Sequence, residues 1–317
     1  MLFARYYFMR IFNIALVSLC GIGIAGALDN NGIELIRDRQ FLNGIGIQSP
    51  TPGSRNIIGK ISTENSKSEP IWNLAQWNSK MPFTNYVVKD INNFCISNSA
   101  KWINVKKGDD GSVSVALGVD SRFEYKTLRK KSSEPWPHLL LQQQIVGSPS
   151  IPEISKALLN MDFRLLETQT FKDEGYSPSL HTAHFQIVFT INNVNKKSPG
   201  YGDFLWFVIP IYDVRYELPP EYIARDFAET RGKLIYTPAA AAFGIKPLKI
   251  GEWQTLNCDI RPFIESSLKT AWKRGYLQDS KDLSDYKISH LNLGWEVPGM
   301  NRVNIEFRNL SLKVYKN

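Results

Sequence analysis

The sequence predicts an all-β fold, a two-sheet antiparallel sandwich of the jelly-roll type with one late α helix. From Ile71 onward the chain is a series of short runs rich in β-branched and aromatic residues, and turn residues separate most of them. Several runs alternate apolar and polar side chains, whereas a single segment, 262–275, has helical spacing. With 317 residues, 43% of them hydrophobic, the chain can bury a large core.

Residues 1–27 have the features of a secretory signal. Arg5 and Arg10 precede a mostly apolar run, and Ala25-Gly26-Ala27 supplies the small residues of a cleavage site. The apolar run is interrupted by Asn13 and is short for a membrane span. We therefore expect a secreted or periplasmic protein with no integral membrane segment after the signal is removed.

The rest of the chain divides into two parts. Residues 28–70 are rich in Asn, Gly, Ser and Pro and are predicted to be irregular. Residues 71–317 are predicted to form the sandwich domain. Its expected strands are 86–91, 101–105, 112–119, 122–128, 138–146, 161–170, 184–192, 203–212, 233–237, 252–258, 288–297 and 303–315.

Alternation indicates which face each side chain occupies. In 184–192 the odd positions are all apolar and the even positions are mostly polar, so one face belongs to the core. The run 203–212 is apolar on both faces, which is typical of a central strand, and regular alternation places Trp206 and Tyr212 on the same side. In the last strand the apolar set moves from odd to even positions, which predicts a bulge near Arg308-Asn309.

One helix is expected late in the domain. Asp259 or a neighbouring residue is suited to cap it, Pro262 falls in the first turn, and Gly275 is a suitable stop. Between strands, a helix of this kind would cover one face or edge of a sheet.

The distribution of charge and the positions of cysteine and histidine indicate whether nucleic acid, a disulfide or a metal is expected. The net charge is +8, or +6 without the signal, but the basic residues are scattered, which argues against nucleic acid as a partner. Cys95 and Cys258 could pair in an oxidising compartment or remain two buried thiols. His181 and His184 fall on opposite faces of a strand, and no other cluster has metal-site spacing, so neither a metal nor a cofactor is expected.

A polar and aromatic face opposite a core face predicts a groove for a sugar chain. Aromatic rings cover the apolar faces of sugars, while amides and carboxylates bond the hydroxyl groups. The alternative is that the aromatic residues are core and the polar residues merely solvated. The candidate groove residues are Trp206, Tyr212, His184, Gln186, Gln142, Gln144, Asn292 and Glu296.

Glu296 is the most informative of these residues. It stands in the largely apolar run Leu293-Gly294-Trp295-Glu296-Val297, just before Pro298-Gly299. With the helix before it and the long last strand after it, this stretch resembles the glycoside hydrolase family 12 endoglucanases, a jelly-roll family of the concanavalin-like class. The matching pieces are 262–275, 294–299 and 303–315, with the second glycine of the motif one residue early. The resemblance implies that Glu296 is a general acid/base.

The same resemblance requires a second carboxylate. The nucleophile of the family is a Glu four residues before a Trp on a central strand, and matching that Trp to Trp206 puts Gly202 at the Glu position. The candidate partners are therefore Asp203, one residue away, and Asp213 at the far end of the strand. Retaining hydrolases need their two carboxyl groups about 5–5.5 Å apart.

Three functions remain open, all with a poly- or oligosaccharide as partner. The first is a carbohydrate-binding module without catalysis. The second is a glycoside hydrolase with Glu296 as acid/base and Asp203 or Asp213 as its partner. The third is a polysaccharide lyase, in which His184 or Tyr212 removes a proton beside a carboxylate. A serine hydrolase is disfavoured because the chain has no Gly-x-Ser-x-Gly sequence.

Overall fold

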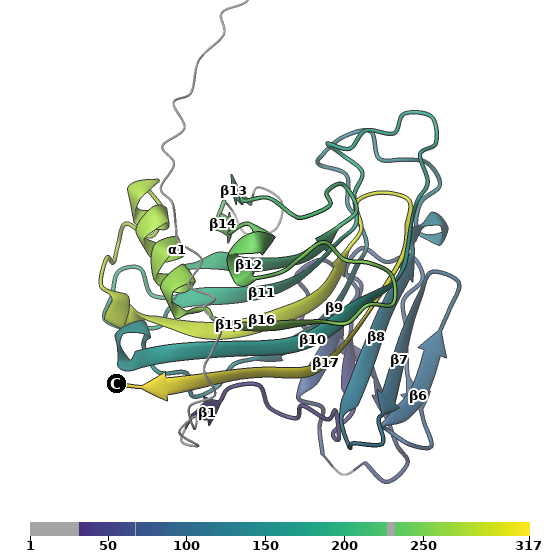
Figure 1. The fold of residues 1–317 in the computed structure, drawn as a ribbon, viewed down its shortest axis with the longest axis horizontal. Helices are drawn as coiled ribbons and strands as arrows, with labels where there is room; N and C mark the ends of the chain where they lie inside the picture. Colours follow the sequence, from purple (N-terminus) through teal and green to yellow (C-terminus); the bar gives the residue numbers. More distant parts are fainter. Residues whose placement is uncertain (1–31, 67, 227–231) are drawn as a thin grey trace, which may run out of the picture.

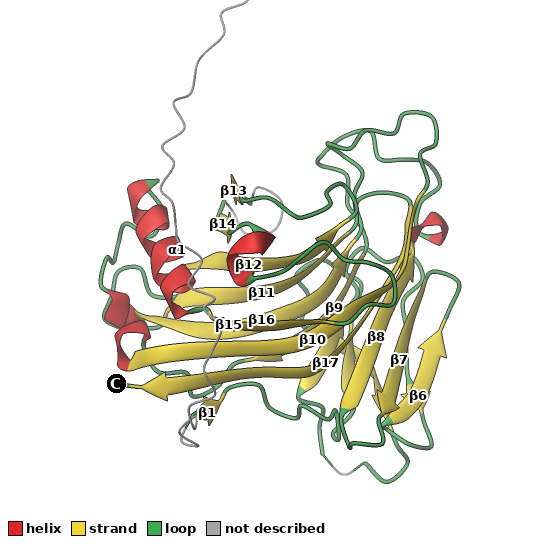
Figure 2. Ribbon diagram, in the orientation of Figure 1, coloured by secondary structure: helices red, strands yellow, loops and turns green. Residues whose placement is uncertain are grey.

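The structure, a computed structural model, describes residues 32–66, 68–226 and 232–317. These residues form two β sheets packed face to face (Figure 1), and most of the remaining chain is loop (Figure 2). The predicted all-β sandwich is therefore confirmed. The predicted signal, 1–27, lies outside the described residues. No helix in the described part of the chain is long and apolar enough to cross a membrane.

Sheet A is the seven-stranded sheet, and the last strand of the chain lies in its middle. β1 (Ile33–Glu34) pairs with β17 beside the main path. The order along that path is β15 (Gln254–Asp259), β10 (Ile154–Thr170), β17 (Asn301–Lys316), β8 (Val113–Asp120), β7 (Lys101–Lys107) and β6 (Asn93–Ser97).

Sheet B has ten strands and is antiparallel through its centre. The pairs β12–β14, β2–β4 and β3–β5 are parallel. The strand order is β13 (Tyr222–Arg225), β14 (Leu234–Thr237), β12 (Phe204–Asp213), β11 (His184–Asn193), β16 (Tyr286–Glu296), β9 (His138–Gln144), β4 (Trp72–Ala75), β2 (Ile45–Gln48), β3 (Ile57–Ser62) and β5 (Tyr86–Val87).

The core lies between the sheets and follows the predicted alternation. On β11, Phe185, Ile187 and Phe189 are fully buried on the inward side. Burying each such side chain contributes about 1.5–3 kcal/mol. Because one face of β11 is core, its alternate residues, His184 among them, point to the outward face of sheet B.

Helix α1 (Arg261–Lys273) confirms the predicted helix. The Asp259 carboxylate accepts a hydrogen bond from the Arg261 N–H at 3.1 Å, and Gly275 with φ 84° follows the helix. Ile264 and Leu268 of α1 are buried in the core. Figure 1 shows the helix in front of the upper strands of sheet B, so it covers inward surface that sheet A does not reach.

Two of the β bulges change which side chains of their strands face the core. The expected bulge in the last strand is confirmed, because the β10–β17 register shifts there and Asn309 has φ 56°. A second bulge, between β11 and β12, was not expected. It pairs Tyr212 with the inward residue Phe185, so the expectation that Tyr212 shares a face with Trp206 is wrong.

The strand boundaries differ from the prediction mainly in the first half of the chain. The segment 28–70 contributes β1, β2 and β3, although its composition predicts irregular structure. The strand expected over 122–128 is instead a short 3-10 turn, Ser121–Phe123, followed by loop. The short strands β4, β6 and β13 have no counterpart in the prediction, because runs of four or five residues show too little alternation to be detected.

The two cysteines of the described chain cannot form a disulfide with each other. Cys95 lies on β6 and Cys258 on β15, which are the opposite edges of sheet A. At about 4.8 Å per strand spacing they are roughly 24 Å apart. A disulfide needs Cα atoms within about 7 Å.

Candidate functional site

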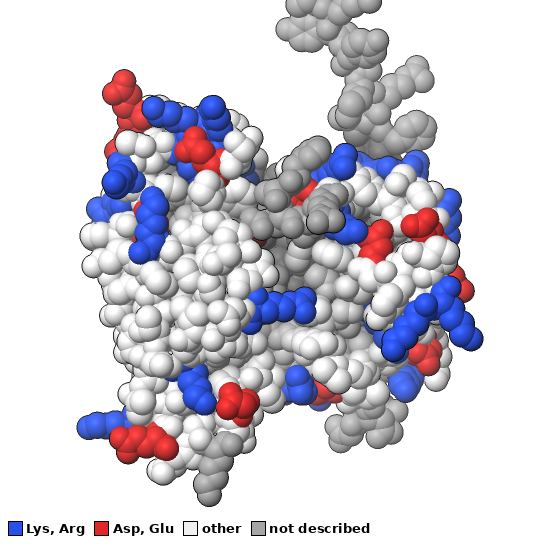
Figure 3. Space-filling model, turned by 180° about the vertical axis from the view of Figure 1, so that it is seen from behind, with Lys and Arg blue, Asp and Glu red and all other residues white. Residues whose placement is uncertain are grey.

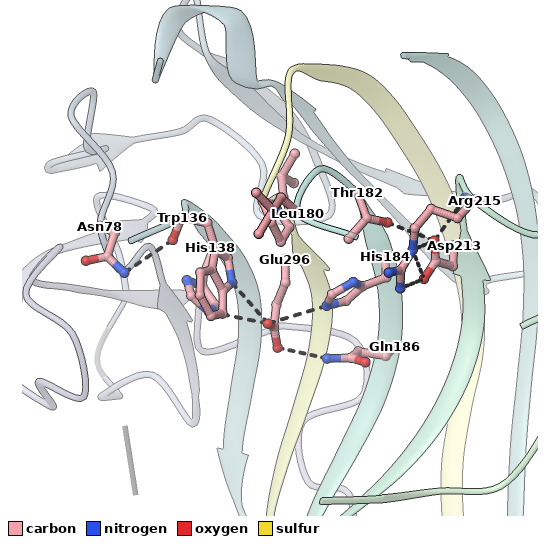
Figure 4. A network of polar contacts seen from close by, with 12 residues as sticks. Asn78, Trp136, His138, Leu180, Thr182, His184, Gln186, Asp213, Arg215 and Glu296 are labelled. Carbon is pink, nitrogen blue, oxygen red and sulfur yellow. Dashed lines mark hydrogen bonds and ion pairs between the residues drawn. The ribbon is translucent and has the colours of Figure 1, made fainter. Parts of the chain in front are cut away.

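Four polar residues from four neighbouring strands lie in one row across the outward face of sheet B. The register pairs His184 of β11 with Asp213 of β12 on one side and with Glu296 of β16 on the other. Glu296 is paired in turn with His138 of β9. We call these four residues the charged row. Figure 4 shows Glu296 between the two imidazole rings.

Glu296 is the centre of a hydrogen-bond network. Its Oε2 accepts from Trp136 Nε1 at 3.2 Å and lies 3.4 Å from His184 Nε2 and 3.6 Å from His138 Nε2. Its Oε1 accepts from the side-chain amide of Gln186 at 2.8 Å. The Glu296 side chain is 21% exposed, so it is not fully covered by its neighbours.

These contacts set the charge of Glu296. Burial alone raises its pKa, but the hydrogen bond from His184, the charges of His138 and His184, and the bond from Trp136 outweigh burial and lower the pKa to about 2. Glu296 is therefore a carboxylate at neutral pH. A group that protonates a leaving oxygen needs a raised pKa. In this arrangement Glu296 is suited to accept hydrogen bonds and to carry a negative charge.

Gly294 allows the strands to approach at this point. Its φ of +148° favours glycine, and a Cβ atom there would lie 2.2 Å from the backbone carbonyl oxygen of Leu139. Gln186 lies opposite Gly294 in the register. A side chain at Gly294 would thus push β9 away from β16 and disturb the spacing between His138 and Glu296.

Arg129 fixes the loop that carries Trp136. The Arg129 side chain is buried, and its guanidinium carbon lies 4.8 Å from the centre of the Trp136 ring. Trp136 also stacks on His138, with ring centroids 5.7 Å apart. The Arg129 guanidinium donates to the backbone carbonyls of Lys131, Ser132, Glu134, Leu180 and Pro298.

Further rows continue the polar face along the strands. The Gln142 amide donates to Asn292 Oδ1 at 2.9 Å, and the register then pairs Gln144 with His290. Most of the expected groove residues are thus brought together on the outward face of sheet B. They are Glu296, His184, Gln186, Gln142, Gln144, Asn292 and Trp206.

Tyr212 is not part of this face. Its ring lies 6.2 Å from that of the buried Trp295, and its hydroxyl donates to Thr168 of β10 at 2.9 Å. The bulge in β12 turns the side chain toward sheet A. The expectation that Tyr212 lines the groove is therefore wrong.

Asp203 is also far from Glu296. It precedes β12 at the end opposite Asp213 and forms an ion pair with Lys233. Its backbone bonds Asn193, nine residues along β11 from His184, which corresponds to about 30 Å. Asp203 therefore cannot be the carboxylate partner of Glu296.

Asp213 belongs to the charged row but does not complete a retaining pair. It is two strand spacings from Glu296, about 9.6 Å between backbones, with His184 between them. Arg215 donates to both Asp213 oxygens at 2.6–3.2 Å, and Thr182 donates to Oδ1 at 2.8 Å. Burial raises the pKa of Asp213, but the Arg215 bonds and the charge of His184 lower it overall. Its oxygens are engaged by the protein, which does not suit a nucleophile.

Sequence reasoning missed His138 and Trp136. Both stand in Pro135-Trp136-Pro137-His138, just where a predicted strand begins, as His184 does. The strand that begins at His138 was expected, but its pairing with the strand of Glu296 was not. Only the register of β9 with β16 shows that His138 faces Glu296.

The outward side of sheet B is hollowed. Sheet A lies in front in Figure 1, so the back view in Figure 3 shows this side, with a hollow near its centre and Lys and Arg side chains beside it.

Among the described residues, no group of three or more His, Cys, Asp or Glu side chains has the geometry to hold a metal ion.

Comparison with known proteins finds likeness in structure alone. No family model and no curated sequence matches the chain. Among solved structures, it is similar to the family 12 xyloglucanase from Bacillus licheniformis, with 14% identity and TM-score 0.39 over 68% of this chain and 88% of that one. It is similar to endoglucanase cel12A from Rhodothermus marinus, with 11% identity and TM-score 0.37 over 72% of this chain and 91% of that one. It is also similar to endoglucanase 3 from Trichoderma harzianum, with 11% identity and TM-score 0.37 over 68% of this chain and 84% of that one.

The resemblance expected from the C-terminal residues is thus also present in the structure, as a distant one. At this identity and TM-score the likeness is one of fold alone.

Proposed function

We propose that the chain binds a carbohydrate chain across the outward face of sheet B, with the charged row at the centre of the site. The observation that carries this proposal is the continuous set of planar hydrogen-bonding groups on one face, from the Glu296 carboxylate and the Gln186 amide to the Gln142–Asn292 pair. Sugar hydroxyls both donate and accept, so they bond such groups readily.

The position of the aromatic residues supports a ligand longer than one sugar. Trp136 lies at the charged row, whereas Trp206 lies opposite Thr190, six residues along β11 from His184. Six residues of strand span about 20 Å. A chain of several sugars could contact both rings.

Export fits this function, because polysaccharides of this kind are found outside cells. The features of residues 1–27 support it.

The binding proposal is tested by calorimetry on ligands selected from a glycan array. Glu296→Gln keeps the shape of the side chain but removes the charge and one acceptor, and it is expected to raise Kd by about tenfold or more. The matched control is Glu306→Gln, on the outward face of sheet A, which is expected to bind as the parent does. Equal loss in the two variants, or no binding of any glycan, would contradict the proposal.

A second candidate is glycoside hydrolysis. One observation favours it: an ionised carboxylate stands between two imidazoles, so Glu296 can stabilise the positive charge that develops on the sugar ring. In this proposal a protonated imidazole gives its proton to the leaving oxygen, and the water that attacks the sugar carbon gives up a proton to solvent. Glu296 then acts as an electrostatic stabiliser rather than as the acid. Release of reducing ends by the parent, lost in Glu296→Gln at glycan concentrations well above the Kd of that variant, would support it; release that survives the substitution would refute it.

Of the two side chains considered as the base of a polysaccharide lyase, His184 and Tyr212, only His184 lies on the outward face of sheet B. Tyr212 bonds Thr168 on the inward side, so it cannot act on the same ligand as His184.

A further inference from the structure

A second groove lies on the outward face of sheet A, on the other side of the sandwich from the charged row. It is open and has a volume of about 500 Å³, which is in the range of known ligand sites. The strands beneath it, β10 and β17, run along the front in Figure 1. The residues that matter here are Leu158, Asn160, Asp162, Lys313 and Tyr315.

The groove begins where the ion pairs of this face end. Further along the strands, Arg164 binds Glu306 at 2.7 Å and Arg308 lies 3.4 Å from Asp162. Beyond Asp162 the paired positions are Asn160 with Ser311 and then Leu158 with Lys313. At this end the one arginine of the lining, Arg39, lies 3.6 Å from Glu34, and the paired positions on β10 and β17 carry no arginine–carboxylate pair.

Three polar side chains in the groove make no hydrogen bond or ion pair with any residue of the described chain. They are the Asn160 amide, the Lys313 ammonium and the Tyr315 hydroxyl. Lys313 stands opposite Glu34, but the Glu34 carboxylate instead accepts from Ser311 and from the backbone N–H of Ile36 and Leu312, and it lies 3.6 Å from Arg39. Lys313 thus forms no ion pair with a carboxylate of the described residues.

The remaining lining supports a ligand with both apolar and charged parts. The ring of Tyr315 is held against the backbone of Gly32, where a Cβ atom would lie 2.9 Å from it. Leu158 is 7% exposed, so the apolar contact comes from the Tyr315 ring. Asp162 is the only carboxylate in the lining, and it already accepts from Thr255 at 2.6 Å and Asn309 at 2.8 Å beside the Arg308 ion pair.

We propose that this groove is a second binding site, for an oligosaccharide that carries carboxylate groups, as uronic acids do. Tyr315 covers a sugar face, Asn160 bonds hydroxyl groups, and Lys313 pairs with the carboxylate. The groove shares no residue with the charged row. It therefore stands or falls separately from the function proposed for sheet B.

The test is calorimetric titration of the whole protein with oligogalacturonate and oligomannuronate, with a neutral cello-oligosaccharide as the comparison. Lys313→Gln and Tyr315→Ala are each expected to raise Kd for at least one acidic ligand by about tenfold. The matched control is Lys106→Gln on β7, in the same sheet and away from the groove, with an expected change below about twofold. Thermal unfolding of each variant checks that the fold is kept.

A fourth variant, Glu296→Gln, separates the two sites. If the groove binds the acidic ligand, this substitution leaves its Kd unchanged even when neutral-glycan binding is lost. Absence of acidic-ligand binding in the parent, an unchanged Kd in Lys313→Gln and Tyr315→Ala, or equal loss in Lys106→Gln would each overturn the proposal. Loss confined to Glu296→Gln would do so as well, because it would place the acidic ligand at the charged row.

Discussion

Glu296 on the outward face of sheet B is held by different partners from the acids on the outward face of sheet A. On sheet A, Glu306 is bound by Arg164 at 2.7 Å and Glu167 by Arg302 at 2.6 Å. On sheet B, Glu296 is surrounded by an indole, an amide and two imidazoles, with no Lys or Arg among its described contacts.

The difference separates a structural surface from a site. An arginine is always charged, and its planar group fits a carboxylate through two parallel bonds, so such a pair satisfies both partners. Neutral or titratable donors hold a carboxylate less completely and can exchange it for a ligand hydroxyl. The presence of acids on a sheet face is thus less informative than the chemistry of their partners.

The largest expected effect compares a glycine from each sheet. Gly294→Ala on sheet B places a Cβ 2.2 Å from a backbone carbonyl at φ +148°, and neither atom can move far. We expect a loss of about 2–4 kcal/mol in the free energy of unfolding. Gly118→Ala on sheet A meets the ring of Trp102, a side chain that can rotate, so a smaller loss of about 1–2 kcal/mol is expected. Urea denaturation of both variants measures this, and equal losses would show that sheet B relaxes at Gly294.

Acid titration sharpens the contrast at Glu296. Its pKa is about 2 in the folded protein against 4.5 ordinarily, so it contributes stability above pH 4.5 that is lost as the pH falls toward 2. The shift corresponds to about 3 kcal/mol as an upper value. Glu296→Gln should therefore unfold less steeply with acid than the parent between pH 5 and 2. His184→Asn should move the loss to higher pH, and parallel curves for all three proteins would contradict the assigned pKa.

A substitution of Arg129 tests whether its guanidinium holds the loop that carries Trp136 at the charged row. Arg129→Lys keeps the charge but cannot reach the same set of carbonyls, and we expect a loss of about 2 kcal/mol in unfolding free energy. Glycan binding should weaken along with it, because Trp136 loses its support. The matched control, Arg122→Lys, changes a 44% exposed arginine. If glycan affinity in Arg129→Lys equals that of the control, Arg129 does not position Trp136.

The smallest effect is expected on sheet A. Arg164→Gln breaks the ion pair with Glu306 and one of the two arginine contacts with Trp253. Glu306 is only 9% exposed, so weakening its bond costs about 1–2 kcal/mol, although the amide of the new side chain can still donate to it. The variant should unfold within that range of the parent and bind neutral glycans unchanged. A large loss of glycan binding would erase the distinction between the two faces.

Local pattern predicted much of this molecule, and its failures have identifiable causes. Alternation on β11 correctly placed His184 and Gln186 opposite Phe185, because burial on one side enforces a period of two. The same rule misplaced Tyr212, since a bulge adds one residue and reverses the faces beyond it. Single-strand patterns also carry no information on neighbours, so the approach of His138 to Glu296 was not predictable.

The place of β17 in sheet A constrains how the chain can assemble. This last strand lies between β10 and β8 and also binds β1, so most of the sheet has no continuous hydrogen-bond ladder until residues 301–317 have been synthesised. Until then the nascent polypeptide exposes unpaired strand edges, and the contacts that close them join distant parts of the sequence. The strands of sheet A thus come together through contacts between distant parts of the sequence, and such slow pairing calls for protection from aggregation.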